Sequence, residues 1–180
     1  CNFYFHLKGL IMSVRIWSIL FILILLSGCA CVGSNCATRD SAREIARDGR
    51  FIAYDDGTVL DTGTNLMWAA KDNGSDISWS AANFYCESYR AGHYDDWRLP
   101  TLEELEALYD ADKDFPAKCN NSNSIHIATK LMDVSCFYVW GSKTSSTTSE
   151  SVIFDFGAGI QSAFAGQMTY FLRVIPVRSP

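Results

Sequence analysis

The stretch Asp96-Trp97-Arg98-Leu99-Pro100-Thr101, followed by Leu102-Glu103-Glu104-Leu105, carries the signal that decides the fold. Threonine followed three residues later by glutamate is a capping box. In that motif the Thr101 hydroxyl accepts from the Glu104 amide, and the Glu104 carboxylate accepts from the Thr101 amide. We therefore predict a helix that starts after Thr101, buries leucines along one stripe and ends by Asp110.

The residues just before this helix are expected to stabilise the fold and not to contact a ligand. Trp97 offers a large apolar surface, so we expect it in the core. Arg98 is expected to bind carbonyl oxygens or a carboxylate, and Pro100 with Thr101 fixes the helix start.

Toward the N-terminus, the sequence predicts three short strands and another helix. The strands are expected at residues 51–54, 58–60 and 66–68, where apolar runs alternate with turn signals. The helix should begin near Ser78 and stop by Gly92, with Trp79, Ala82, Cys86 and Tyr89 on one face.

Toward the C-terminus, residues 110–135 read as a long polar loop and residues 143–151 as an exposed Ser/Thr loop. Strands are expected at 137–140, 152–156 and 171–177. Strands, two helices, a long loop and further strands make an α+β fold.

The N-terminal part reads as a lipoprotein export signal. Met12 and Arg15 precede an apolar run over 16–26 that is too short for a transmembrane helix, which needs about 20 residues. The lipobox Leu26-Ser27-Gly28-Cys29 follows, so we expect cleavage before Cys29 and lipid on its sulfur. Residues 1–11 are expected to be upstream sequence outside the working protein.

Residues 29–48 are expected to form a tether, with a weak helix possible over Ser41–Arg47, and the folded domain to span 49–180. The whole chain has 15 basic and 20 acidic residues. Cleavage would remove Lys8 and Arg15, which leaves 13 basic residues against 20 acidic ones and a formal charge of −7. Nucleic acid is therefore not an expected partner.

The cysteine count indicates an oxidising compartment but leaves the pairing open. Of the seven cysteines, six follow the cleavage point, and five remain if Cys29 carries lipid. Because five is odd, one thiol should be free or paired between chains. No CxxC pair occurs, so no metal site or cofactor is expected.

Three segments together resemble a known family. They are Asp56 to Thr62 with Leu66-Met67-Trp68, then Trp79 to Cys86 with the Trp97–Thr101 block, and finally Val152–Phe156 with Phe171–Val174. Over about residues 50–178 the chain resembles the bacterial Lcl C-terminal-like domain, named for the last domain of a collagen-like adhesin. This resemblance implies a C-type-lectin-like fold with mixed antiparallel strands, two helices and long loops.

The resemblance also bears on the cysteines and on calcium. In this family the helix cysteine, here Cys86, often pairs with a cysteine in the final strand, where this chain has none. This implies that Cys86 is the odd, buried thiol and that Cys119 and Cys136 form a disulfide. The pairing of Cys31 and Cys36 stays open. The chain lacks the Glu-Pro-Asn and Trp-Asn-Asp motifs of calcium-dependent lectins, so calcium-dependent sugar binding is not implied.

No catalytic constellation joins His93 and His126, so an enzyme is not expected. The alternating acids of 110–114 lack the glycine and distal glutamate of an EF-hand and read as a solvated loop. The expected ligand contacts are Trp140, as an aromatic platform beside the Ser/Thr loop, with Lys143 and Arg173 as polar partners.

These features together predict a lipid-anchored envelope lipoprotein, expected at the outer membrane because Ala30 follows Cys29. Its domain is expected to bind a glycan or a protein in adhesion. The alternative is a structural or assembly lipoprotein without a saccharide ligand.

Overall fold

Helix α3 (Leu102–Glu106) begins at the predicted capping box. In the computed structural model, the Thr101 hydroxyl accepts from the Glu104 amide, and the Glu104 carboxylate accepts from the Thr101 amide at 2.8 Å. Arg98 donates two hydrogen bonds, of 2.8 and 2.7 Å, to the two oxygens of that carboxylate. Burial alone would raise the pKa of Glu104, but the bonds from Arg98 and the Thr101 amide hold it below its ordinary value.

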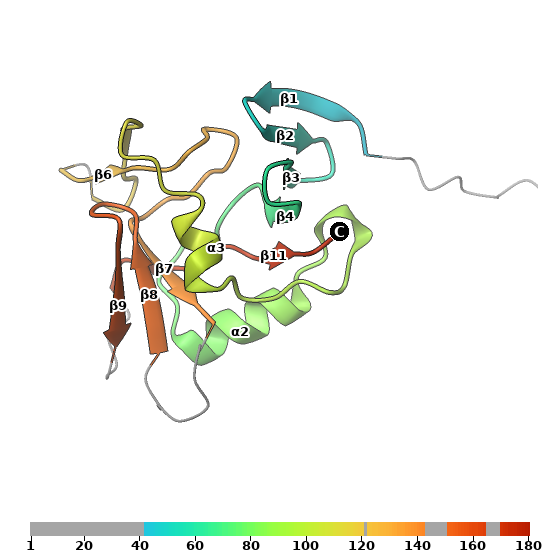
Figure 1. The fold of residues 1–180 in the computed structure, drawn as a ribbon. Coiled ribbons are helices and arrows are strands. Elements are labelled where there is room, and N and C mark those ends of the chain that lie inside the picture. Colours follow the sequence, from blue (N-terminus) through green and yellow to red (C-terminus); the bar gives the residue numbers. More distant parts are fainter. Residues whose placement is uncertain (1–41, 121, 143–150, 165–169) are drawn as a thin grey trace, which may run out of the picture. The chain divides into compact units, whose positions relative to one another are not determined.

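The structure describes residues 42–120, 122–142, 151–164 and 170–180. Within them the fold is α+β, as predicted, with strands that pair mainly antiparallel (Figure 1). The predicted signal segment, Cys29 with its lipid, the tether up to residue 41, and Lys143 lie outside the described residues.

The first sheet has the strand order β1-β2-β3-β4-β11. Three of its strands, β2 (Phe51–Tyr54), β3 (Thr58–Asp61) and β4 (Leu66–Ala69), lie where the sequence predicts them. They form an antiparallel meander in which Ile52 is opposite Leu60 and Val59 is opposite Trp68. This register places Val59 and Trp68, both buried, together in the core.

Strand β1 (Glu44–Asp48) corrects the prediction of a tether through residue 48 and of a helix over Ser41–Arg47. It pairs antiparallel with β2, so the folded domain starts before residue 49. The Thr129 hydroxyl also donates to the Asp48 carboxylate at 2.8 Å. Because the strand lies at the sheet edge and is mostly exposed, its sequence lacks the apolar alternation that would reveal it.

The second sheet has the strand order β10-β7-β8-β9. Strands β7 (Tyr138–Gly141) and β8 (Ser151–Asp155) lie within one residue of their predicted ranges. Strand β9 (Ile160–Phe164) was not predicted. It pairs with β8 at the edge of the sheet, and Ile160, Gln161 and Ala163 are exposed, so it also lacks an apolar pattern.

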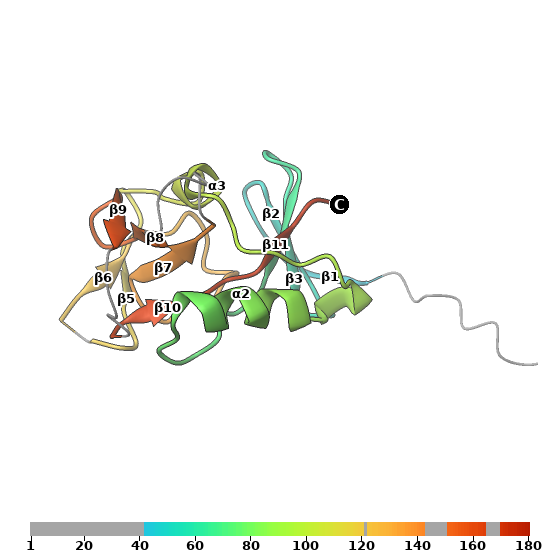
Figure 2. The same cartoon turned by 90° about the horizontal axis from the view of Figure 1, so that it is seen from below.

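The C-terminal segment, predicted as one strand over 171–177, forms two strands in different sheets. Strand β10 (Leu172–Arg173) is parallel to β7, and β11 (Val177–Arg178) is antiparallel to β4. Between them lies Pro176, which has no amide hydrogen for a ladder. The segment therefore passes from one sheet to the other (Figure 2).

Helix α2 (Trp79–Ser88) starts at the predicted cap, where the Ser78 hydroxyl accepts from the Ala81 amide. It ends four residues before Gly92, which lies in the 3-10 turn η1 (Ala91–His93) with φ +64°. Figure 2 shows the helix running along the second sheet and β11. Among the described residues, no helix has the length and apolar character that crossing a membrane requires.

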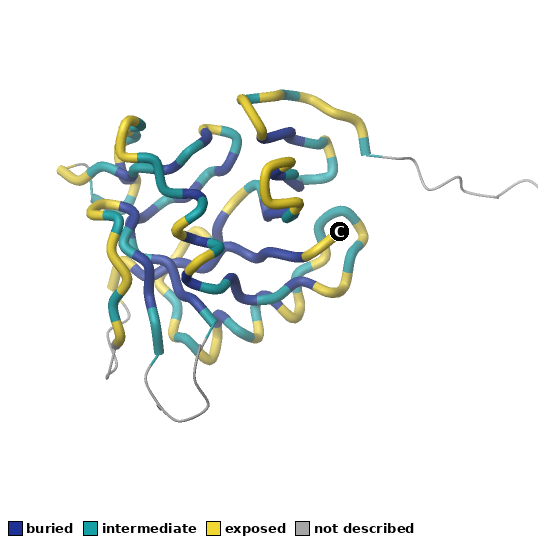
Figure 3. Tube along the Cα trace, viewed as in Figure 1, coloured by how far each residue is buried: buried dark blue, intermediate teal, exposed yellow. Residues whose placement is uncertain are grey.

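Two clusters of buried side chains hold these elements together. The larger cluster contains buried residues of the first sheet, Leu102 and Leu105 of α3, and Val139 and Phe154 of β7 and β8. Figure 3 shows the buried residues along these elements in dark blue. The smaller cluster lies between α2 and the second sheet and contains Ala82, Cys86, Leu99, Trp140, Ile153, Leu172 and Val174.

Trp97 is buried, as predicted, with 3% of its surface exposed. Its indole N–H donates to the Ala91 carbonyl at 3.3 Å, and its ring meets Tyr89 edge to face at 5.1 Å. The next residue, Arg98, forms a bridge with Val177 of β11. The block is thus a scaffold element, as the sequence indicates.

The segment 110–135 is less solvated than predicted. It contains the short antiparallel pair of β5 (Phe115–Pro116) and β6 (Ser124–Ile125). Its buried side chains, which belong to the larger core cluster, are Ala117, Ile125, Ile127, Met132 and Val134. The Cys119–Cys136 disulfide is confirmed, with a Cα–Cα distance of 5.4 Å.

Replacing Glu104 by glutamine should lower the free energy of unfolding by roughly 1 kcal/mol at pH 7, because Arg98 loses its charged partner. The effect is small because the Arg98 side chain is partly exposed and solvent weakens the ion pair. The lowered pKa of Glu104 gives a stability that is present above the unfolded value of about 4.3 and lost as pH falls through the folded value. The difference between wild type and Glu104→Gln should therefore shrink as pH falls below about 4.3 and vanish only below the lowered pKa of the folded state.

Chemical unfolding monitored between pH 3 and 8 measures this difference. Glu103→Gln is the matched control, because Glu103 is an exposed neighbour in the same helical turn. Equal effects of the two substitutions would show that only the helix dipole matters.

Candidate ligand-binding site

A small pocket lies where β7 begins and β8 ends. We call it the sheet-end pocket. Its volume is about 290 Å³, and its lining residues are Asn123, Ser124, His126, Phe137, Tyr138, Asp155, Gly157 and Ala158.

The second sheet supplies one side of the sheet-end pocket. Tyr138 and Asp155 are directly opposite each other on the antiparallel strands β7 and β8. Directly opposite side chains lie on the same face of a sheet, with Cβ atoms about 5 Å apart. The phenol of Tyr138 and the carboxylate of Asp155 are therefore neighbours.

The turn after β8 is held in one conformation. One oxygen of Asp155 accepts from the Gly157 amide at 2.8 Å, and the Asp155 carbonyl accepts from the Gly159 amide at 2.7 Å. Gly159 has φ +70°, and a Cβ there would lie 2.6 Å from the Tyr109 ring. Only glycine fits this position, so the turn that carries Gly157 and Ala158 is rigid.

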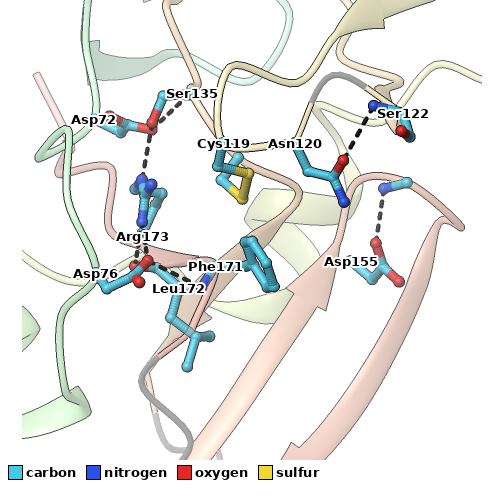
Figure 4. The surroundings of a disulfide bond; sticks show 12 residues. Asp72, Asp76, Cys119, Asn120, Ser122, Ser135, Asp155, Phe171, Leu172 and Arg173 are labelled. Atoms are coloured by element: carbon cyan, nitrogen blue, oxygen red, sulfur yellow. Dashed lines mark hydrogen bonds and ion pairs between the residues drawn. A yellow bond between two sulfur atoms is a disulfide. The ribbon is translucent and has the colours of Figure 1, made fainter.

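The opposite wall of the pocket is the segment 123–126. The Asn123 carbonyl accepts from the Ala117 amide at 2.9 Å, and the His126 amide donates to the Phe156 carbonyl at 2.8 Å. The Nδ1 atom of His126 lies 2.5 Å from the Lys113 carbonyl, so Nδ1 carries the proton. The disulfide at Cys119 anchors the start of this segment beside the second sheet (Figure 4).

Several polar groups in the sheet-end pocket have no hydrogen-bond partner within the described part of the chain. They are the hydroxyls of Ser124 and Tyr138, the side-chain amide of Asn123 and the second carboxylate oxygen of Asp155. Tyr138 also meets Phe137 edge to face at 4.5 Å, so an apolar wall stands beside these groups. A few converging polar groups next to apolar surface are typical of small-ligand sites.

A second pocket, of about 310 Å³, lies on the other side of the disulfide and is lined by Lys71, Asp72, Gly74, Lys118, Cys119, Asp133, Ser135 and Arg173. Its charged groups are largely paired. Arg173 binds Asp76 and donates to the Ser135 hydroxyl at 2.8 Å, and that hydroxyl donates to Asp72 (Figure 4). The Lys118 ammonium binds Asp133. This network therefore serves mainly to join three loops.

Trp140 was predicted as a ligand platform, and its burial contradicts that prediction. Only 2% of its surface is exposed, and its indole N–H donates to the Ile77 carbonyl at 2.8 Å. Helix α2 covers it in the smaller core cluster. Tyr138, two residues earlier and so on the same face of β7, packs against the same cluster but is only partly buried and lines the pocket instead.

Arg173, the other predicted contact within the described residues, is also buried, with 6% of its surface exposed. It belongs to the ion-pair network and lines the second pocket, not the one that Tyr138 lines. The structure thus does not bring Trp140 and Arg173 together as an open site. Four residues of the pocket were not predicted from the sequence: Asn123, Ser124, Tyr138 and Asp155. The available signal was Asp155, a charged residue within the otherwise apolar run 152–156.

Cys86 is a free, buried thiol, as the resemblance implies. Burial, helped by the nearby Glu87 charge, raises the pKa of Cys86 to about 12. The thiol is therefore protonated at neutral pH and a poor nucleophile.

Fold and site together define a disulfide-linked α+β domain with a small polar pocket at one end of its second sheet. The chain belongs to the Lcl C-terminal domain family, whose family model matches residues 57–178. Comparison with curated proteins gave no match, and neither did comparison with solved structures.

Mass mapping should find one peptide that joins Cys119 to Cys136. Cys86 should react with an alkylating reagent only after unfolding, because its thiol is both buried and protonated. A peptide joining Cys86 to Cys36 would instead show that the tether is bonded to the domain.

Proposed function

We propose that the chain is an envelope lipoprotein, anchored by acyl chains on Cys29, whose Lcl C-terminal domain is a binding module for a glycan or a protein. The observation that carries the binding role is the sheet-end pocket with its unpaired polar groups. We also propose that the domain has a C-type-lectin-like fold, as the family resemblance implies. Such an arrangement, in which irregular segments on a rigid scaffold carry the contacts, is common for binding sites.

We propose that the domain is not an enzyme. The most nucleophilic type of side chain among the described residues, the Cys86 thiol, is protonated and buried. His126 lies in the pocket, but the pocket lining holds no cysteine, and its single serine, Ser124, is not hydrogen-bonded to the imidazole. These features support recognition over covalent catalysis.

The N-terminal signal supports the proposal of an outer-membrane location, and the family resemblance supports the proposal of a role in adhesion. The lipobox supports acylation of Cys29, and Ala30 does not supply the aspartate that retains lipoproteins at an inner membrane. Several acyl chains on one cysteine hold a protein stably, since each buried CH₂ contributes roughly 0.8 kcal/mol.

The second candidate function is assembly with envelope proteins. It is favoured by large apolar side chains on the surface, above all Phe84 at 71% and Tyr170 at 69% exposure. Exposed aromatic residues are common anchors in protein interfaces.

Cells that express the chain should incorporate labelled palmitate into it, and Cys29→Ser should abolish the label, because the acyl chains need that sulfur. Cys86→Ser is the control, since a buried thiol offers no acylation site. Equal labelling of the wild-type and Cys29→Ser chains would refute the anchor.

Replacing Ala158 by leucine should reduce binding at least tenfold without unfolding the domain. Ala158 is exposed and lines the sheet-end pocket, so a larger side chain fills the space a ligand would take. The measurement is binding of the full chain, in detergent, to a glycan array and to envelope extract.

The matched control is Ala81→Leu, which makes the same change at an exposed position on helix α2. If both variants bind like the wild type, the sheet-end pocket is not the site, and the assembly function becomes the better candidate.

A further inference from the structure

We infer that the sheet-end pocket takes a single uncharged sugar ring, recognised through its hydroxyl groups, and that it discriminates against acidic sugars. This inference rests on the proposed binding function and narrows its ligand class. The first support is the kind of polar groups in the pocket. The hydroxyls of Ser124 and Tyr138 and the amide of Asn123 can each donate and accept, whereas the free oxygen of Asp155 only accepts.

This mixture of donors and acceptors separates the possible ligand classes. A phosphate or sulfate needs donors alone, and an ammonium group needs acceptors alone. A sugar hydroxyl both donates and accepts, so it can satisfy each of these groups. A ligand that offers both donors and acceptors can therefore pair with all of these groups at once.

The charge of the pocket is the second support. Its lining contains no lysine or arginine, and Asp155 is its carboxylate. The arginines and lysines nearest the disulfide lie in the second pocket and are mostly paired there. An acidic sugar would place a second negative charge beside Asp155 without a cation to offset it, which is unfavourable.

The third support is size and shape. The pocket volume of about 290 Å³ is at the lower end of ligand sites, which suits one ring and not a chain of rings. Gly157 keeps this space open, since a Cβ there would lie 3.5 Å from the Ser124 carbonyl oxygen and 3.7 Å from the Phe137 Cβ. The partly exposed Tyr138 ring offers apolar surface for the C–H groups of a sugar.

Asp155 has the decisive position. Its first oxygen is bound to the Gly157 amide, so the carboxylate cannot turn freely and its second oxygen is available to a ligand. Asparagine at this position can keep the bond to Gly157 while replacing the acceptor with an N–H donor. Asp155→Asn therefore changes recognition and leaves the turn in place.

The experiment is ligand-observed NMR titration of the full chain in detergent. The probes are methyl glycosides of glucose, galactose and mannose, each compared with its uronic acid. We expect the best neutral glycoside to bind at least tenfold more tightly than its uronic acid, Asp155→Asn to weaken it at least tenfold, and Ala158→Leu to abolish it. Ala81→Leu should bind like the wild type, and circular dichroism melts check that every variant is folded.

The outcomes separate the two proposals. Tighter binding of a uronic acid, still abolished by Ala158→Leu, would overturn the neutral-sugar inference and keep the binding function. Saccharides that never bind, while Ala158→Leu removes an envelope protein partner, would also overturn the inference alone. Binding that survives Ala158→Leu in every assay would overturn both.

Discussion

Two backbone hydrogen bonds between Arg98 and Val177, of 2.9 and 3.0 Å, join the middle of the chain to its end. The Arg98 side chain holds the carboxylate that caps α3, so the bridge and the helix start share one residue. From Val177 the chain pairs with β4, and from Leu172 it pairs with β7. The relative placement of both sheets and of α3 therefore depends on a C-terminal segment of seven residues and on the residue that meets it.

Features of the fold that depend on near neighbours could be predicted from the sequence. The capping box at Thr101 and the serine cap at Ser78 each need only residues within one helical turn. The edge strands β1 and β9 could not be predicted, because their pairing comes from distant backbone and their exposed side chains follow no period. The split of the last segment at Pro176 likewise depends on which sheet each half meets.

The candidate site was predictable only in part. The predicted strand, β7, does line the candidate site, but the predicted residue does not. Trp140 and Tyr138 share a face of β7; Trp140 is buried, whereas Tyr138 is partly exposed and lines the pocket. The other wall comes from a loop without periodicity, so no pattern of residues indicated Asn123 or Ser124. The guanidinium group of Arg173 could bind a ligand, but its N–H groups already donate to Ser135 and Asp76.

The disulfide joins Cys119 to Cys136, 17 residues apart in the sequence, and segment 123–126 lies in the loop that it closes. Such a closure stabilises by roughly 3 kcal/mol, and it forms and persists only where thiols are oxidised. In a reducing compartment the same chain would have one wall of its pocket held by backbone hydrogen bonds alone. The rigidity of the pocket thus depends on the redox state of its surroundings, because this wall is fully held only where the two thiols are oxidised.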